Sequence, residues 1–142
     1  PMLSVTTDVM VGFPGETEEN HQKSMDFIRE IELDNLHIFK YSKRKGTRAA
    51  EFSNQVDDIV KKTRALEMSK LKDELQNNFL VKKIGKKMNV LIEKNIKNKT
   101  EGYSENYIKV LIDTKGIRIE ENSIVEVEIT SVNKNFLIGG LV

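Results

Sequence analysis

The spacing of apolar residues divides the sequence into two parts that follow different periods. In the first part, an apolar run at 9–11 ends abruptly at Gly12, which is typical of a buried parallel strand. A helical stretch at 18–33 and a second strand-like run at 36–41 follow. Strand, helix and strand at this spacing predict a βαβ unit. Such a unit exposes two sheet edges and is not a complete domain.

Two helices are predicted in this first part. The helix at 18–33 has Thr17 as its N-cap and two glutamates in its first turn. Its apolar positions are Met25, Ile28 and Ile31, with Phe27 beside them. The helix at 57–81 has Asn54 or Asp57 as its cap and no interrupting Gly or Pro. Its apolar stripe, expected to be a packing seam, consists of Ile59, Thr63, Leu66, Met68, Leu71, Leu75 and Phe79.

From about residue 86 onward the apolar period changes to two. The expected strands are Met88–Glu93, Thr100–Ser104, Tyr107–Asp113, Ile124–Val132 and Phe136–Val142. Five short antiparallel strands in about sixty residues predict a small closed barrel, because closure removes the sheet edges of so small a domain. The fold class is therefore α+β. A βαβ unit with a long helix spans 1–81, and a five-stranded antiparallel OB-like β-barrel spans 82–142.

The composition excludes several kinds of chemistry. None of the 142 residues is cysteine, so the sequence offers no disulfide, no thiolate nucleophile and no cysteine-held iron–sulfur cluster. No serine–histidine–carboxylate set or phosphate-binding loop stands out. His21 and His37 are isolated and are expected to be a helix-surface and a strand residue rather than catalytic bases. The sequence therefore predicts no catalytic residue and no metal site.

Charge is distributed unevenly although the net charge is only +1. Residues 1–81 hold 12 basic and 14 acidic side chains, whereas residues 82–142 hold 11 and 8. Seven lysines lie between Lys82 and Lys99 and are accompanied there only by Glu93. A run of like charges is usually a solvated face, but here it coincides with the change of period and favours binding of a polyanion.

Two further features concern the setting of the chain. No apolar run approaches the length of a membrane span and no signal peptide is visible, so we expect a soluble, cytoplasmic protein without a membrane partner. The sequence starts at Pro1-Met2 almost directly in a strand, and we interpret it as a fragment of a longer protein. A fragment with open sheet edges is expected to associate with itself.

The segment Asp8–Thr17 (Asp-Val-Met-Val-Gly-Phe-Pro-Gly-Glu-Thr) resembles a late-strand motif of radical S-adenosylmethionine enzymes, most closely those that attach methylthio groups to tRNA. The resemblance implies that residues 1–81 are the carboxyl-terminal part of a truncated (β/α) barrel. It also implies that four residues line the S-adenosylmethionine pocket: Gly12, Pro14, Gly15 and Glu16.

Two more segments carry the same resemblance, in the same order. The basic loop Tyr41–Ala50 is similar to the segment after the last barrel strand of the methylthiotransferases, although many members have proline where this chain has Lys43, Lys45 or Arg48. Gly102–Val110 and Phe136–Gly140 resemble the TRAM domain, a small RNA-binding barrel. The loop and the opening motif would converge at the carboxyl edge of the sheet.

The resemblance implies an enzyme that uses S-adenosylmethionine and four-iron–four-sulfur clusters to add a methylthio group to a modified adenosine next to the anticodon. The threonylcarbamoyladenosine branch is favoured. A chain without cysteine holds no such cluster, so these residues are expected to be inactive alone and to bind no cofactor. They would supply one wall of the S-adenosylmethionine site and the contact with the tRNA anticodon arm.

Residues of the barrel part are candidates for RNA contact, because lysines pair with phosphates and tyrosines stack on bases. They are Lys86, Lys87, Lys94, Lys97, Lys99, Tyr103, Tyr107 and Lys109. Other functions stay open at this stage. The barrel could be an OB-like RNA-binding module on an unrelated α/β enzyme, the substrate could be a ribosomal protein, or the chain could be an adaptor without a nucleic-acid role.

Overall fold

The computed structural model describes residues 3–142. The helices and strands, in chain order, are β1 (Thr6–Val11), α1 (Glu18–Glu30), β2 (Asn35–Lys40), the short helix η1 (Arg48–Glu51), α2 (Asp58–Val81), β3 (Lys87–Ile96), β4 (Lys99–Ser104), β5 (Lys109–Asp113), β6 (Ile124–Asn133) and β7 (Phe136–Leu141). The chain divides into an α/β unit, Val5–Leu75, and a barrel unit, which comprises residues 76–142 with residues 3–4.

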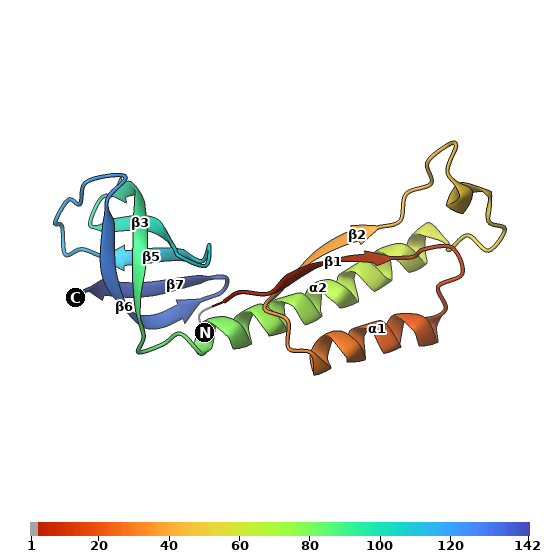
Figure 1. The fold of residues 1–142 in the computed structure, drawn as a ribbon, viewed down its shortest axis with the longest axis horizontal. Coiled ribbons are helices and arrows are strands. Elements are labelled where there is room, and N and C mark those ends of the chain that lie inside the picture. The colour runs from red at the N-terminus through yellow and green to blue at the C-terminus, as the bar shows by residue number, and fades with distance from the viewer. Residues whose placement is uncertain (1–2) are drawn as a thin grey trace. The chain divides into compact units, whose positions relative to one another are not determined.

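The α/β unit has the predicted strand–helix–strand order. β1 and β2 pair in parallel, with Val9 opposite Ile38. Both helices cover the same face of this sheet (Figure 1), and their apolar residues form one core with the strands. That core consists of Val11, Met25, Ile28, Leu36, Met68, Leu71 and Leu75. The parallel sheet and its helices agree with part of the expected barrel remnant.

The predicted helix caps are confirmed. The Thr17 hydroxyl accepts a hydrogen bond from the N–H of Asn20 at 3.1 Å. At the start of α2, a carboxylate oxygen of Asp57 accepts one from the N–H of Ile59 at 2.8 Å. Each cap satisfies an N–H group that has no partner within the helix.

The predicted apolar stripe is wrong for the first turns of α2. Ile59, Thr63 and Leu66 are exposed, the first to 77% and the last to 58%. The buried side chains in these turns are Lys61 and Arg64, because this end of the helix faces the charged turn after β1 and not the apolar core. From Met68 onward the stripe is buried as predicted.

Helix α1 also differs from its predicted face. Met25 and Ile28 are buried, but Phe27 is 59% exposed and Ile31, the C-cap, is 44% exposed. His21, expected on the helix surface, is buried to 1% exposure because it lies on the same face as Met25 and Ile28 and meets α2.

The barrel unit is closed in the strand order β3-β4-β5-β7-β6, with β6 returning to β3. It is a mixed barrel and not the expected antiparallel one, because β5 and β7 run parallel. A closed ring of five strands requires at least one parallel neighbour pair, since directions alternate completely only around an even number. Apolar side chains that alternate along the strands fill its interior, with Phe79 and Leu80 of α2 in the same cluster.

Candidate functional site

The turn between β1 and α1 is held closed by the side chain of Glu16. Its Oε2 atom accepts a hydrogen bond from the N–H of Gly12 at 2.6 Å and one from the Arg64 guanidinium at 2.8 Å. Arg64 also donates to the backbone carbonyl of Glu16 at 2.9 Å. Only 14% of the Glu16 side chain and 6% of the Arg64 side chain are exposed. We call Gly12, Glu16 and Arg64 the Glu16 clip. It determines the shape of the chain at the carboxyl end of β1.

Two glycines make this turn possible. Gly12 and Gly15 have positive φ angles of 73° and 88°, and neither has room for a side chain. A Cβ on Gly12 would overlap the Lys61 side chain, and one on Gly15 would lie 2.5 Å from the side-chain nitrogen Nδ2 of Asn54. Gly12, Pro14, Gly15 and Glu16, predicted to line a cofactor pocket, therefore lie together in one tight turn. Sequence reasoning missed Arg64, which closes the turn from 48 residues away.

The basic loop after β2 starts at a buried tyrosine. The N–H of Tyr41 donates to the carbonyl of Val11 at 2.9 Å, and its ring lies edge-on to Phe13 with centroids 5.4 Å apart. The Lys61 ammonium lies 5.6 Å from the centre of the same ring. Tyr41 is 8% exposed, and its hydroxyl has no hydrogen-bond partner within residues 3–142. The loop meets the turn after β1 at this point, as the sequence predicts.

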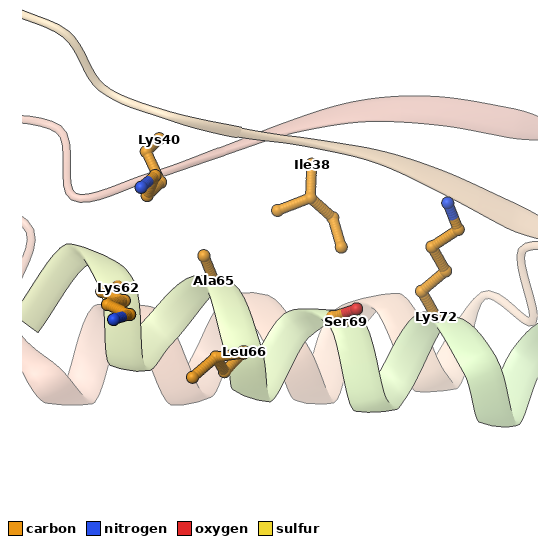
Figure 2. A pocket seen from close by; sticks show the side chains of 7 residues that line it. All are labelled: Ile38, Lys40, Lys62, Ala65, Leu66, Ser69 and Lys72. Atoms are coloured by element: carbon orange, nitrogen blue, oxygen red, sulfur yellow. The ribbon is translucent and has the colours of Figure 1, made fainter.

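Two neighbouring cavities lie beside β2 and α2. One, of about 420 Å³, is lined by Ile38, Lys40, Lys62, Ala65, Leu66, Ser69 and Lys72. Figure 2 shows Ile38 pointing from the strand toward the helix, which contributes Ala65 and Leu66 to the apolar part of the lining. Three lysines lie around these apolar side chains: Lys40, Lys62 and Lys72. The other, of about 620 Å³, is lined by Lys40, Tyr41, Ser42, Lys43, Asp58, Lys61 and Lys62. Lys40 and Lys62 line both cavities.

The buried histidine joins the two long helices. The Nε2 atom of His21 lies 3.0 Å from a carboxylate oxygen of Glu67, and its Nδ1 atom has no partner among the described residues. Its spacing from Met25 and Ile28, four and seven residues on, was the signal that it lies on the apolar face. His37 is exposed on β2. Within residues 3–142, no three His, Asp or Glu side chains come close enough to hold a metal ion.

On the barrel, Tyr107 differs most from its predicted environment. It does not belong to β5, which begins at Lys109, but lies in the β4–β5 loop with a positive φ of 59°. Its N–H donates to the carbonyl of Ser104 at 2.9 Å, so the loop is a defined turn. The side chain is 89% exposed. A bulky residue rarely adopts this backbone conformation, and no packing compensates for its cost here.

Tyr103 and Lys109 lie opposite each other on β4 and β5. Both are half-buried, and both point outward, since Gly102 and Val110 beside them are buried in the barrel. The Lys109 ammonium binds Glu101 at 2.5 Å, and this hydrogen bond raises the pKa of Lys109 above its usual value. Leu91 pairs with both Tyr103 and the exposed Ile124, so an apolar strip that sequence reasoning missed continues from Tyr103 across β3 to β6.

The remaining candidate lysines lie at both ends of the β3–β4 hairpin. Lys86 precedes β3 and Lys87 is its first residue, at the same end as the Tyr107 loop, because β3 and β4 are antiparallel. Lys87 lies 3.4 Å from a Glu126 carboxylate oxygen. The other three surround the turn between β3 and β4 and are exposed: Lys94, Lys97 and Lys99. The eight candidates thus cover the outer surface of β3, β4 and β5 and do not form one compact cluster.

No helix in the described part of the chain is long and apolar enough to cross a membrane. No family model matches the sequence. The chain is 40% identical over 134 residues, 91% of its length, to the threonylcarbamoyladenosine tRNA methylthiotransferase MtaB of Bacillus subtilis. It is 36% identical over 98% of its length to a tRNA-2-methylthio-N(6)-dimethylallyladenosine synthase of Bartonella tribocorum. A probable threonylcarbamoyladenosine tRNA methylthiotransferase of Methanocaldococcus jannaschii is 43% identical over 74% of the chain.

These matches extend through both units, and the chain spans about 30% of the length of the first two relatives. Its homologues over nearly its whole length are tRNA methylthiotransferases, with the threonylcarbamoyladenosine type among them. The predicted resemblance to tRNA methylthiotransferases is therefore confirmed.

Proposed function

We propose that this chain is the carboxyl-terminal part of a radical S-adenosylmethionine tRNA methylthiotransferase and that its barrel, a TRAM domain, binds the tRNA anticodon arm. The relatives named above are tRNA-modifying enzymes of two substrate types. The relative from Bacillus subtilis supports the threonylcarbamoyladenosine type. The whole protein would work in the cytoplasm, where its tRNA substrate is made and used.

Tyr107 is the observation that carries the RNA-binding part of this proposal. An 89% exposed ring on a left-handed residue has a conformational cost and no compensating contact in the barrel. Bases stack on such rings, and neighbouring lysines neutralise the adjoining phosphates. The strand order also matches this use, because five-stranded OB barrels bind nucleic acids over their second and third strands. Here these strands are β4 and β5, with Tyr103 and Lys109 on their outer face.

We assign the turn after β1 to one wall of the S-adenosylmethionine site. The Glu16 clip holds this turn rigidly at the carboxyl end of a parallel strand, where α/β proteins place ligands. The sequence contains no cysteine, so it offers no donor set for an iron–sulfur cluster. The clusters would be held by parts of the enzyme outside these residues, and bound S-adenosylmethionine would supply the methyl group. The 142 residues alone should have no methylthiotransferase activity.

Binding of a tRNA anticodon stem-loop to the 142-residue chain at several salt concentrations tests the proposal. Affinity should fall by about 0.7 to 0.9 logarithmic units per contacted phosphate for each tenfold rise in salt. Replacing Lys86 and Lys87 together by Ala should reduce this slope. Replacing Lys23 and Lys70, two exposed lysines on α1 and α2, removes the same charge elsewhere and should leave the slope unchanged.

Tyr107→Asn separates stacking from folding. Asparagine tolerates the left-handed conformation, so this variant should be at least as stable as the parent chain. Loss of a stacked base should nevertheless weaken RNA binding by about 1–3 kcal/mol with little change in the salt slope. A stable Tyr107→Asn variant that binds the stem-loop like the parent would remove this ring from the RNA site.

A further inference from the structure

The cavity of about 620 Å³ at the carboxyl end of β2 has an excess of positive charge. Four of its seven lining residues are lysines, and one is an acid, Asp58. Lys40, Lys43 and Lys62 make no ion pair within residues 3–142, and all three side chains are exposed at its rim. The cavity belongs to the α/β unit, whereas the candidate RNA-contact residues belong to the barrel unit.

The fourth lysine is held in place inside the cavity wall. The Lys61 side chain is 11% exposed, and its ammonium binds an Asp58 carboxylate oxygen at 2.9 Å. That contact lowers the pKa of Asp58, so the carboxylate stays ionised. The Lys61 stem packs against Gly12 and its ammonium lies over the Tyr41 ring. These contacts preorganise one cation, and the three rim lysines remain available for a ligand.

Tyr41 lines the cavity without offering a polar atom to it. The residue is more than nine-tenths buried, and its hydroxyl lies beneath the surface, with no partner among the described residues. A ligand in the cavity therefore meets the lysine ammonium groups and not this hydroxyl. With lysines on the other walls, the ligand that fits best presents several acceptor oxygens and more than one negative charge.

We propose that this cavity binds phosphate groups, with the exposed ammonium groups of Lys40, Lys43 and Lys62 neutralising their charge. The neighbouring cavity of about 420 Å³ shares Lys40 and Lys62 and adds Lys72 (Figure 2), which leaves room for a second phosphate along β2 and α2. The phosphates could belong to an RNA strand or to a free phosphate compound. Only the RNA source rests on the proposed function.

Inorganic pyrophosphate is the first probe, titrated into the 142-residue chain at constant ionic strength and followed by calorimetry. Lys43→Gln and Lys62→Gln should each weaken binding by about threefold to tenfold. Their matched controls are Lys45→Gln, in the same loop, and Lys70→Gln, on the same helix; neither residue lines the cavity, and neither change should weaken binding.

Tyr41→Phe is a further control, because its hydroxyl lies beneath the cavity surface and has no partner to lose. Pyrophosphate binding and the stability of the free chain should both stay as in the parent. Absence of saturable pyrophosphate binding would overturn the proposal. Equal losses in the Lys43→Gln and Lys45→Gln variants would overturn it too.

The same variants titrated with the anticodon stem-loop identify the source of the phosphate. If RNA binding weakens in the cavity variants, the cavity and the barrel contact one RNA, whereas unchanged RNA binding assigns the cavity to a free phosphate compound. Failure of the barrel variants Lys86/Lys87→Ala and Tyr107→Asn to affect RNA binding would contradict the proposed function alone. The pyrophosphate result would be unaffected by that failure.

Discussion

Every strand of the barrel unit has two hydrogen-bonded neighbours, whereas each strand of the α/β unit has one within the described residues. The barrel therefore satisfies its own backbone groups, and the α/β unit leaves both outer edges of its sheet open. Neither α1 nor α2 covers the second face of that sheet. This face carries Met10 and Phe39, which are 53% and 51% exposed. Sheet closure makes the barrel self-sufficient, and the α/β unit has the open surfaces of part of a larger sheet.

The turn after β1 and several loops of the barrel differ as well. The turn after β1 uses glycines, because Lys61 and Asn54 occupy the space that a side chain would need. The barrel places residues with side chains in left-handed conformations at its loops: Lys97, Tyr107, Lys115, Asn122 and Lys134. All five can contact phosphates or bases. Crowding selects glycine in the turn after β1, whereas the open barrel loops tolerate exposed side chains at some conformational cost.

The largest expected effect is on the Glu16 clip. Arg64→Met should destabilise the α/β unit by about 3–5 kcal/mol, because it leaves the Glu16 carboxylate largely buried without its cation. The double variant Glu16→Gln/Arg64→Met should recover part of that loss. Urea unfolding followed by the helical circular dichroism signal measures both. A double variant less stable than Arg64→Met would show that the clip is not the origin of the effect.

Adjacent glycines in β7 provide the matching test of the barrel. A Cβ on Gly139 would lie 2.5 Å from a Val127 methyl group and 2.6 Å from the Glu128 carbonyl, whereas one on Gly140 would meet nothing within 4 Å. Gly139→Ala should cost about 1–3 kcal/mol and Gly140→Ala much less. Hydrogen exchange of the β6 and β7 amides would report the difference. Equal protection in both variants would contradict close packing at Gly139.

The open sheet face predicts self-association of the isolated chain. Phe39→Lys should weaken any dimer about tenfold, equivalent to about 1.4 kcal/mol, because it places a charge on this face. Phe27→Lys is the matched control, since Phe27 is similarly exposed but lies on α1. Sedimentation equilibrium measures the dissociation constants. If both variants associate like the parent, or the parent stays monomeric, the open face does not drive association.

The smallest effects concern two ion pairs that titrate at opposite ends of the pH scale. The hydrogen bond from Lys61 lowers the pKa of Asp58 below 3.8. The ion pair therefore stabilises the folded chain above pH 3.8, and this stabilisation is lost as the pH falls through the pKa that Asp58 has in the folded chain. The hydrogen bond to Glu101 raises the pKa of Lys109 above 10.5. This ion pair therefore stabilises the folded chain below pH 10.5, and the stabilisation is lost as the pH rises through the pKa that Lys109 has in the folded chain.

The stability of Asp58→Asn should therefore differ from that of the parent at neutral pH and become equal to it in acid. The stability of Lys109→Met should differ from that of the parent at neutral pH and become equal to it in strong base. Thermal unfolding across the pH range shows both trends. A pH-independent difference for either variant would mean that the ion pair is not its cause.

The sequence by itself determined the elements and their order, because these depend on neighbouring residues. Thr17 and Asp57 cap the helices that were predicted for them, and the change from helical to strand periodicity marks where β structure begins. The same local signals located the turn at Gly12–Glu16 and indicated the resemblance to tRNA methylthiotransferases that the homologues confirm.

Only the tertiary structure decided which polar residues are buried and what they bind. Arg64 meets Glu16 across 48 residues, and His21 meets Glu67 across 46, so no local period could identify these partners. The parallel pairing of β5 and β7 likewise follows from closing a ring of five strands, which no single strand specifies. The cavity around Tyr41 and Lys61 is formed by β2, the basic loop and α2 together, and its charge arises only where these segments meet.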